Sequence, residues 1–177
     1  MTFRRMARRA GAVATAIALA CGSTESPTGA LTPCATSDAV STEGWQRIDS
    51  GPFSLLMPPG FAAVDAQPID SRAAVFRNMA DSMEIGYDYG WYSSDLTPDA
   101  DRLIERTRCA ASIGGKPATI VLGEVAGIGE SGRYVVAGAW RDVESSDPPV
   151  HLTVWSTAHD SARTGMLFAV LNSIEFQ

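Results

Sequence analysis

The chain is poor in the side chains on which most enzymatic sites depend. Its 177 residues include one lysine, two histidines and three cysteines. The two histidines fall in different predicted elements, His151 in a strand and His159 at the start of the last helix. No Gly-x-Ser-x-Gly elbow is present, so nothing in the sequence predicts a nucleophilic triad. We therefore expect no catalytic residue and no enzymatic activity.

The sequence also lacks a complete metal-binding or phosphate-binding motif. Asp95, Thr97, Asp99 and Asp101 alternate oxygen groups as a calcium loop does, but the glycine at position six and the glutamate at position twelve of such a loop are absent. Capping of a helix explains the same residues. The glycines of 123–132 are followed by neither a helix nor a Lys-Ser or Lys-Thr pair, which favours a turn or bulge. We expect no metal ion and no cofactor.

A long apolar run is missing as well. The uncharged stretch Ala10–Ala20 is about eleven residues long, whereas a membrane-spanning helix needs roughly twenty. Small Ala20 precedes Cys21, and a basic segment comes before the apolar stretch, with Arg4, Arg5, Arg8 and Arg9. This order is typical of a bacterial lipoprotein export signal. We predict that residues 1–20 are a signal peptide and that Cys21 carries a lipid.

Two alternatives to this interpretation are open. An ordinary secretory signal cleaved near Cys21 would leave that cysteine unmodified. The Arg4-Arg5 pair also allows export by the twin-arginine route. A lipidated protein would be anchored to the bacterial membrane and would face the periplasm or the cell exterior. Its membrane attachment would be strong, because each buried methylene contributes about 0.8 kcal/mol and the lipid carries two or three acyl chains. The choice between inner and outer membrane is left open.

Basic residues are scarce once the signal is removed. Residues 1–20 carry four arginines and no acidic residue, so about ten basic side chains remain against 20 acidic ones. A net charge of about −10 makes the mature chain a poor partner for nucleic acid or for anionic lipid headgroups. Membrane attachment would therefore depend on the lipid.

The remaining cysteines form an even pair. If Cys21 carries the lipid, Cys34 and Cys109 remain for a disulfide in an oxidising compartment. Such a bond would close a loop of about 76 residues, worth roughly 4–5 kcal/mol. Two unpaired thiols are the alternative, because Cys34 lies in the Ser-, Thr-, Pro- and Gly-rich stretch 21–44, which we expect to be a flexible linker. The globular domain is expected over 45–177.

Strand patterns dominate this domain. In 82–91 apolar and aromatic residues alternate strictly with polar residues and glycines, the period of a strand with one buried face. We predict further strands over 45–48, 53–57, 73–79, 118–125, 132–143 and 150–157. A helix is predicted from Thr97 to the pair Gly114-Gly115, and a last helix over 160–171 with Asp160 as its cap. The fold class is α+β, with an antiparallel sheet of about six strands flanked by helices.

The order of these elements, with three sequence stretches, resembles the PsbP/Mog-type fold. The stretches are FSLLMPPGF at 53–61, the residues Gly132, Tyr134 and Val136, and LFAVLNSIEF at 167–176. Bacterial PsbP-like lipoproteins are the nearest in character, and the resemblance covers 45–176. It implies an antiparallel sheet flanked by helices and a non-catalytic role in partner binding or complex assembly, since members with known roles bind proteins. Fold alone does not fix function.

The aromatic residues of the domain allow two interpretations, as core residues or as a binding surface. Some line one face of a predicted strand and are expected in the core beneath a helix: Tyr87, Tyr89, Trp91, Tyr134 and Trp140. Trp155 and Tyr92 have the opposite parity to their apolar neighbours and are candidates for an exposed partner or ligand surface. The leading hypothesis is a lipid-anchored envelope protein that binds another envelope protein. The alternative is a small-ligand module with an aromatic-lined pocket between sheet and helix.

Overall fold

Two antiparallel sheets and one α-helix make up the part of the chain that the structure, a computed structural model, describes: residues 33–34, 40–65, 70–93, 103–125 and 133–177. The strands are β1 (Gln46–Asp49), β2 (Phe53–Met57), β3 (Ala62–Val64), β4 (Arg72–Asn78), β5 (Met83–Gly90), β6 (Leu103–Ile113), β7 (Lys116–Val125), β8 (Arg133–Glu144), β9 (Val150–Ala158) and β10 (Glu175–Phe176). The helix α1 (Thr164–Asn172) follows a short 3₁₀ turn, Ser161–Arg163.

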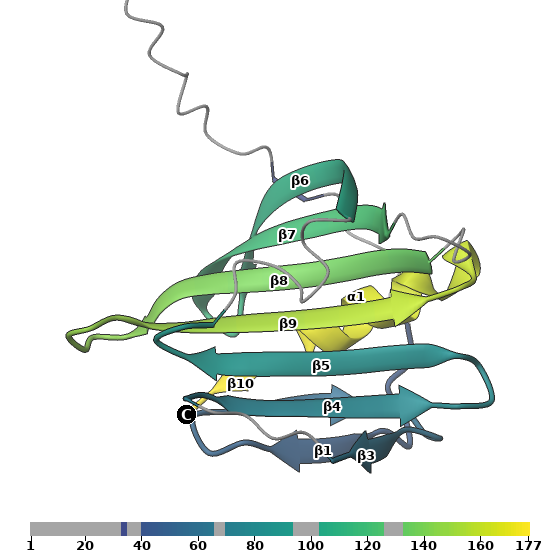
Figure 1. The fold of residues 1–177 in the computed structure, drawn as a ribbon, viewed down its shortest axis with the longest axis horizontal. Helices are drawn as coiled ribbons and strands as arrows, with labels where there is room; N and C mark the ends of the chain where they lie inside the picture. The colour runs from purple at the N-terminus through teal and green to yellow at the C-terminus, as the bar shows by residue number, and fades with distance from the viewer. Residues whose placement is uncertain (1–32, 35–39, 66–69, 94–102, 126–132) are drawn as a thin grey trace, which may run out of the picture.

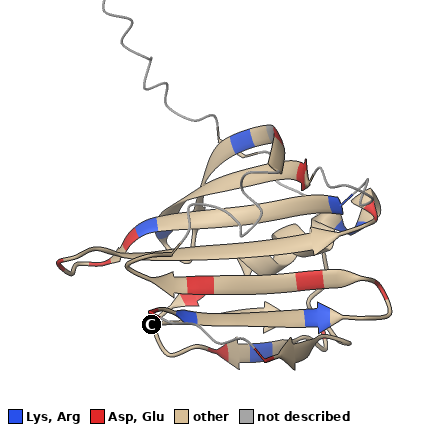
Figure 2. Ribbon diagram, in the orientation of Figure 1, with Lys and Arg blue, Asp and Glu red and all other residues tan. Residues whose placement is uncertain are grey.

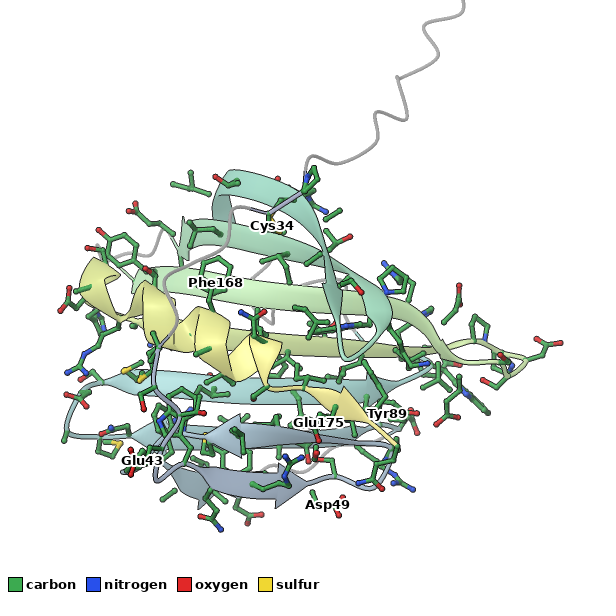
Figure 3. All side chains as sticks on the ribbon, turned by 180° about the vertical axis from the view of Figure 1, so that it is seen from behind. Cys34, Glu43, Asp49, Tyr89, Phe168 and Glu175 are labelled. Atoms are coloured by element: carbon green, nitrogen blue, oxygen red, sulfur yellow. A yellow bond between two sulfur atoms is a disulfide. The ribbon has the colours of Figure 1, made fainter. Side chains whose placement is uncertain are left out.

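A seven-stranded sheet in the order β3-β4-β5-β9-β8-β7-β6 forms the body, and β1-β2-β10 form a small second sheet. The helix α1 lies against one face of the large sheet (Figures 1 and 3). The small sheet joins the same core, since the Phe53 ring of β2 meets the Tyr87 ring of β5 edge to face, with 5.1 Å between centroids. Burial between these layers is what holds the two sheets and the helix together.

The sequence patterns explain most of these elements. In β5 the odd-numbered residues from Met83 to Tyr89 are buried, as the period of two predicts. In the last helix Leu167, Val170 and Leu171 are buried, and the Asp160 carboxylate accepts a hydrogen bond from the Ala162 N–H at 2.9 Å. The predicted antiparallel sheet with a packed helix is confirmed. The described residues contain more strands than the six expected.

The helix predicted from Thr97 to Gly114-Gly115 is wrong where the structure describes it. Leu103–Ile113 is strand β6, which pairs with β7 down to Ile113 opposite Lys116. Gly114 and Gly115 have φ angles of 59° and 76°, so they form the two-residue hairpin turn that requires left-handed backbone. In β6, the side chains of Cys109 and Ile113 are buried in the core. Pairing with β7 satisfies the backbone N–H and C=O groups of this segment, which a helix would have satisfied within itself.

A short stretch in the middle of the predicted linker, Pro33 and Cys34, is attached to the edge of the large sheet. Cys34 forms a disulfide with Cys109 of β6, and its N–H donates a hydrogen bond to the Ala110 carbonyl at 2.9 Å (Figure 3). Pro33 pairs with Ala110 in a parallel bridge. These contacts cover part of an edge strand that would otherwise present unpaired backbone groups.

Several predicted features lie outside the described residues. They are the signal peptide with Cys21, the oxygen-rich residues 95–101 and the glycine-rich turn 126–132. Within the described ranges, no helix has the length and apolar character needed to cross a bilayer.

Candidate functional site

The chain leaves the sheet abruptly at the end of β5. After Gly90 it turns back, and the Ser93 N–H donates to the Gly90 carbonyl at 3.4 Å. The Ser93 hydroxyl donates to the Asp88 carbonyl at 2.8 Å and lies 3.1 Å from the Thr153 hydroxyl. These side-chain hydrogen bonds hold the chain against β5 and β9 where the backbone pairing of β5 has ended. This turn lifts the two aromatic residues at 91 and 92 out of the sheet.

Both aromatic side chains of the turn face solvent. Trp91 is 55% exposed and Tyr92 is 78% exposed. The exposure expected of Tyr92 is therefore confirmed. The expectation that Trp91 lies in the core is wrong, because β5 ends at Gly90 and the alternation stops with it. The residues Ser93, Ser94 and Asp95 were the available signal, since serine and aspartate favour turns and so indicate that the strand ends before them.

Trp155, the other expected surface residue, is buried. Only 6% of it is exposed, and it packs with Val125, Val135 and Ala137 in a second apolar cluster. Its parity does place it on the face of the sheet away from the main core. That face has an apolar cluster of its own, so the expectation of an exposed Trp155 is wrong.

A shallow groove of about 520 Å³ lies beside the exposed aromatic pair. We name it the β5-end groove; it is lined by Asp70, Ser71, Arg72, Tyr89, Gly90, Trp91 and Val150. Gly90 lets the preceding loop come close, because a Cβ at this position would lie 3.0 Å from the Ser71 Cβ. The groove together with Tyr92 is called the β5-end surface below.

The floor of the groove is fixed by a hydrogen bond between two strands. The Tyr89 hydroxyl donates to the Glu144 carboxylate at the end of β8. Burial, and then this hydrogen bond, raise the pKa of the Tyr89 phenol well above its usual value. The phenol is therefore protonated at neutral pH, and its ring packs 5.9 Å from that of Phe53, between centroids. The groove thus has a base of buried, hydrogen-bonded Tyr89 and an exposed rim that includes Asp70 and Trp91.

Charged residues surround this end of the molecule. Figure 2 shows acidic residues on the connection between β8 and β9, and Figure 3 shows Asp49 and Tyr89 at the same end. The Arg72 guanidinium donates to the Ser50 carbonyl at 3.4 Å, in the turn between β1 and β2. Arg72 thus joins the groove to the small sheet.

A smaller pocket of about 280 Å³ lies at the opposite end of the sheet. Its charges are partly neutralised, because Arg77 and Glu84 form an ion pair at 2.8 Å. His159 also lines this pocket, whereas the Nδ1 of His151 accepts the Asp142 N–H at 3.3 Å elsewhere. The two histidines are thus not brought together. In the described ranges no group of three His, Cys, Asp or Glu side chains is placed to hold a metal ion.

The space expected to form a ligand pocket between sheet and helix is occupied by the main core. Leu167, Val170 and Leu171 of α1 are fully buried there against the sheet. The two pockets described above lie instead at the ends of the strands. The chemistry they offer is binding through aromatic faces, carboxylates and guanidinium groups.

Comparison with known proteins identifies the fold. No family model matches the sequence, and no curated protein is similar to it. Among solved structures, the solution structure of cyanobacterial PsbP (CyanoP) from Synechocystis sp. PCC 6803 is similar, with a TM-score of 0.53 and 15% sequence identity. The match covers 81% of this chain and 98% of that chain. The chain therefore has the PsbP-like fold that the sequence resemblance implied.

Proposed function

We propose that this protein is a non-catalytic accessory protein of the bacterial cell envelope, held at the membrane by a lipid on Cys21, and that it binds another envelope protein through the β5-end surface. The observation that carries the proposal is the adjacent exposure of Trp91 and Tyr92 beside a groove. Tryptophan and tyrosine are enriched at the centres of protein interfaces, where their large rigid surfaces are buried at low entropic cost.

The PsbP-like fold and the disulfide support the same proposal. The fold resemblance implies an accessory role, and a disulfide such as Cys34–Cys109 persists in oxidising compartments outside the cytoplasm. Because Cys34 is fixed to β6, the free tether would run only from Cys21 to Cys34. At about 3.5 Å per extended residue, these roughly 13 residues reach at most about 45 Å. The domain would work close to the membrane surface.

Site-specific cross-linking tests the surface. A photoreactive phenylalanine analogue replaces Tyr92 in the full chain, and this variant is expressed in the protein's native host. We expect a reproducible cross-link to one envelope protein, and we expect Trp91→Ala to abolish it. The matched control places the same analogue at Met79, which is 83% exposed near the opposite end of the sheet. Identical products from both positions, or none from position 92, would contradict the proposal.

A small-ligand role is the second candidate, and the β5-end groove is the observation that favours it. A volume of about 520 Å³ falls in the range of small-molecule sites. Native mass spectrometry of the protein purified from its own membranes checks this role. A bound small molecule that is lost in Trp91→Ala would support it, and a ligand-free spectrum would count against it.

A further inference from the structure

We infer that the segment bound at the β5-end surface is basic, with an arginine or lysine side chain placed over the Trp91 face and beside the Asp70 carboxylate. This inference rests on the proposed function and adds the charge of the partner. It starts from Trp91, which is both exposed and part of the groove wall. The indole ring is the strongest aromatic partner for a cation, because its face carries the negative part of the ring quadrupole.

One carboxylate lines the groove with Trp91, and two more lie at the same end of the molecule, where each already accepts a hydrogen bond. Asp70 lines the groove, and Glu144 meets the Tyr89 hydroxyl at its base. Asp49 lies in the turn that Arg72 contacts. Asp70 is exposed and forms no hydrogen bond or ion pair with the rest of the described chain. Its carboxylate is therefore available to a ligand.

Two of the cations near this end of the molecule have partners in the small sheet. Arg47 pairs with Glu175 at 2.7 Å, and the Lys116 ammonium lies 5.2 Å from the centre of the Phe176 ring. Arg72 is directed at the small sheet, where its guanidinium donates to Ser50 and a Cβ at Gly51 would lie only 2.8 Å from it. The groove lining thus carries one carboxylate, Asp70, and one guanidinium, that of Arg72, which is turned toward the small sheet. The negative charge that favours a basic partner is that of the chain as a whole, which has 20 acidic against 14 basic residues.

A basic segment satisfies each of these features at once. A guanidinium can stack on the indole ring and donate to a carboxylate with the same planar group. The overall negative charge of the mature chain would also attract such a segment from a distance, which raises the rate of association. An acidic or neutral segment would leave Asp70 without a partner, and an acidic one would also be repelled by the net negative charge of the molecule.

Two synthetic decapeptides test the inference on the full chain purified from membranes. One alternates arginine with glycine and the other alternates glutamate with glycine. Trp91 reports binding by its fluorescence, since it is the most exposed of the four tryptophans: Trp140 and Trp155 are buried, and Trp45 is partly buried against the core. We expect the arginine peptide to give a saturable change with a Kd on the order of 1 mM at low salt, and added salt to weaken it. The glutamate peptide should give none, and Trp91→Ala should remove the signal.

Matched charge variants locate the effect. Asp70→Asn should weaken binding of the arginine peptide by about twofold to fivefold, the range of one exposed cation contact. Glu43→Gln removes the same charge from an exposed residue at the far end of the molecule (Figure 3) and should leave binding unchanged. Equal thermal midpoints for both variants and the wild type show that the fold is intact.

Three results would overturn the inference: no saturable change with the arginine peptide, an equal change with the glutamate peptide, or equal effects of Asp70→Asn and Glu43→Gln. If one of these results appears while the cross-link from position 92 persists, the basic partner is wrong and the proposed function stands. If the cross-link from position 92 is absent while the arginine peptide still binds, the proposed protein partner is wrong and the preference of the surface for basic segments stands.

Discussion

At the scale of single residues, the contact between Trp155 and Gly86 is a sharp test of packing. A Cβ added to Gly86 would lie 2.3 Å from the Trp155 ring, which is held from other sides by Val135 and Ala137. Gly86→Ala should therefore lower the free energy of unfolding by about 1–3 kcal/mol, as overpacked sites do. Urea denaturation followed by circular dichroism measures the change.

Gly165→Ala is the control for this substitution. Gly165 lies in α1, and the nearest atom to an added Cβ is 3.6 Å away. Because alanine has the higher helix propensity, this variant should be unchanged or more stable by up to about 1 kcal/mol. Equal losses of stability at the two glycines would mean that Trp155 is not packed tightly over Gly86.

The buried phenol of Tyr89 predicts a pH dependence. Its folded-state pKa is raised by burial and by the hydrogen bond to Glu144, whereas an unfolded tyrosine ionises near pH 10. The stability that it contributes is fully present below about pH 10 and is lost as the pH rises above that value, by up to about 1.4 kcal/mol per pH unit.

Chemical denaturation between pH 8 and pH 11 measures this loss. Tyr89→Phe removes the ionisable group, so its stability should fall less steeply above pH 10 than that of the wild type. Tyr92→Phe, which removes an exposed phenol outside the core, is the control and should keep the wild-type slope. Parallel profiles for wild type and Tyr89→Phe would show that this phenol ionises normally in the folded protein.

The aromatic residues show what sequence parity can and cannot predict. Parity correctly assigned Tyr87 and Tyr89 to the core face and Trp155 to the opposite face. It could not predict that the opposite face is also packed, because that packing depends on residues far along the chain. Nor could it predict the exposure of Trp91, which follows from the hydrogen bonds that Ser93 makes across the sheet.

At the scale of elements, the disulfide between Cys34 and strand β6 controls how the N-terminal segment is held. Replacing both cysteines by serine should lower the free energy of unfolding by about 4 kcal/mol, because the unfolded chain regains the entropy of a loop spanning 75 residues. A reducing agent should lower the free energy of unfolding of the wild type to that of the double variant. It should leave the free energy of unfolding of the double variant unchanged. A loss in the double variant without any response of the wild type to reductant would contradict this account.

Strand β6 marks the limit of local sequence patterns. Leu103, Ile104 and Thr107 have helical spacing, but the segment becomes a strand because β7 offers a complete ladder. The Gly114-Gly115 pair was the available signal, since a two-residue glycine turn between apolar runs predicts a hairpin as well as a helix end. In β5 and α1 the apolar pattern extends over the whole element, and there the prediction from sequence is correct.

At the scale of the whole molecule, the fold could be predicted and the task could not. Turn and core residues such as those of 53–61 and 167–176 carry the resemblance to the PsbP-like fold, because they are the residues that packing constrains. The β5-end groove is built from residues that are distant in the sequence, among them Asp70, Tyr89 and Val150. Their chemistry becomes visible only when the sheet brings them together.

The proposed lipid anchor also acts at the scale of the whole molecule, since it would decide where the domain meets the proposed partner. Mass spectrometry of the mature N-terminus should find Cys21 acylated, and Cys21→Ser should release the protein from the membrane fraction. Cys34→Ser is the matched control: it should remain anchored while losing the bond to Cys109. The thermal midpoint of Cys21→Ser should equal that of the wild type, because the described core lies beyond the tether. An unmodified Cys21 would remove the anchor from the proposal and leave the β5-end surface to act in a freely exported protein.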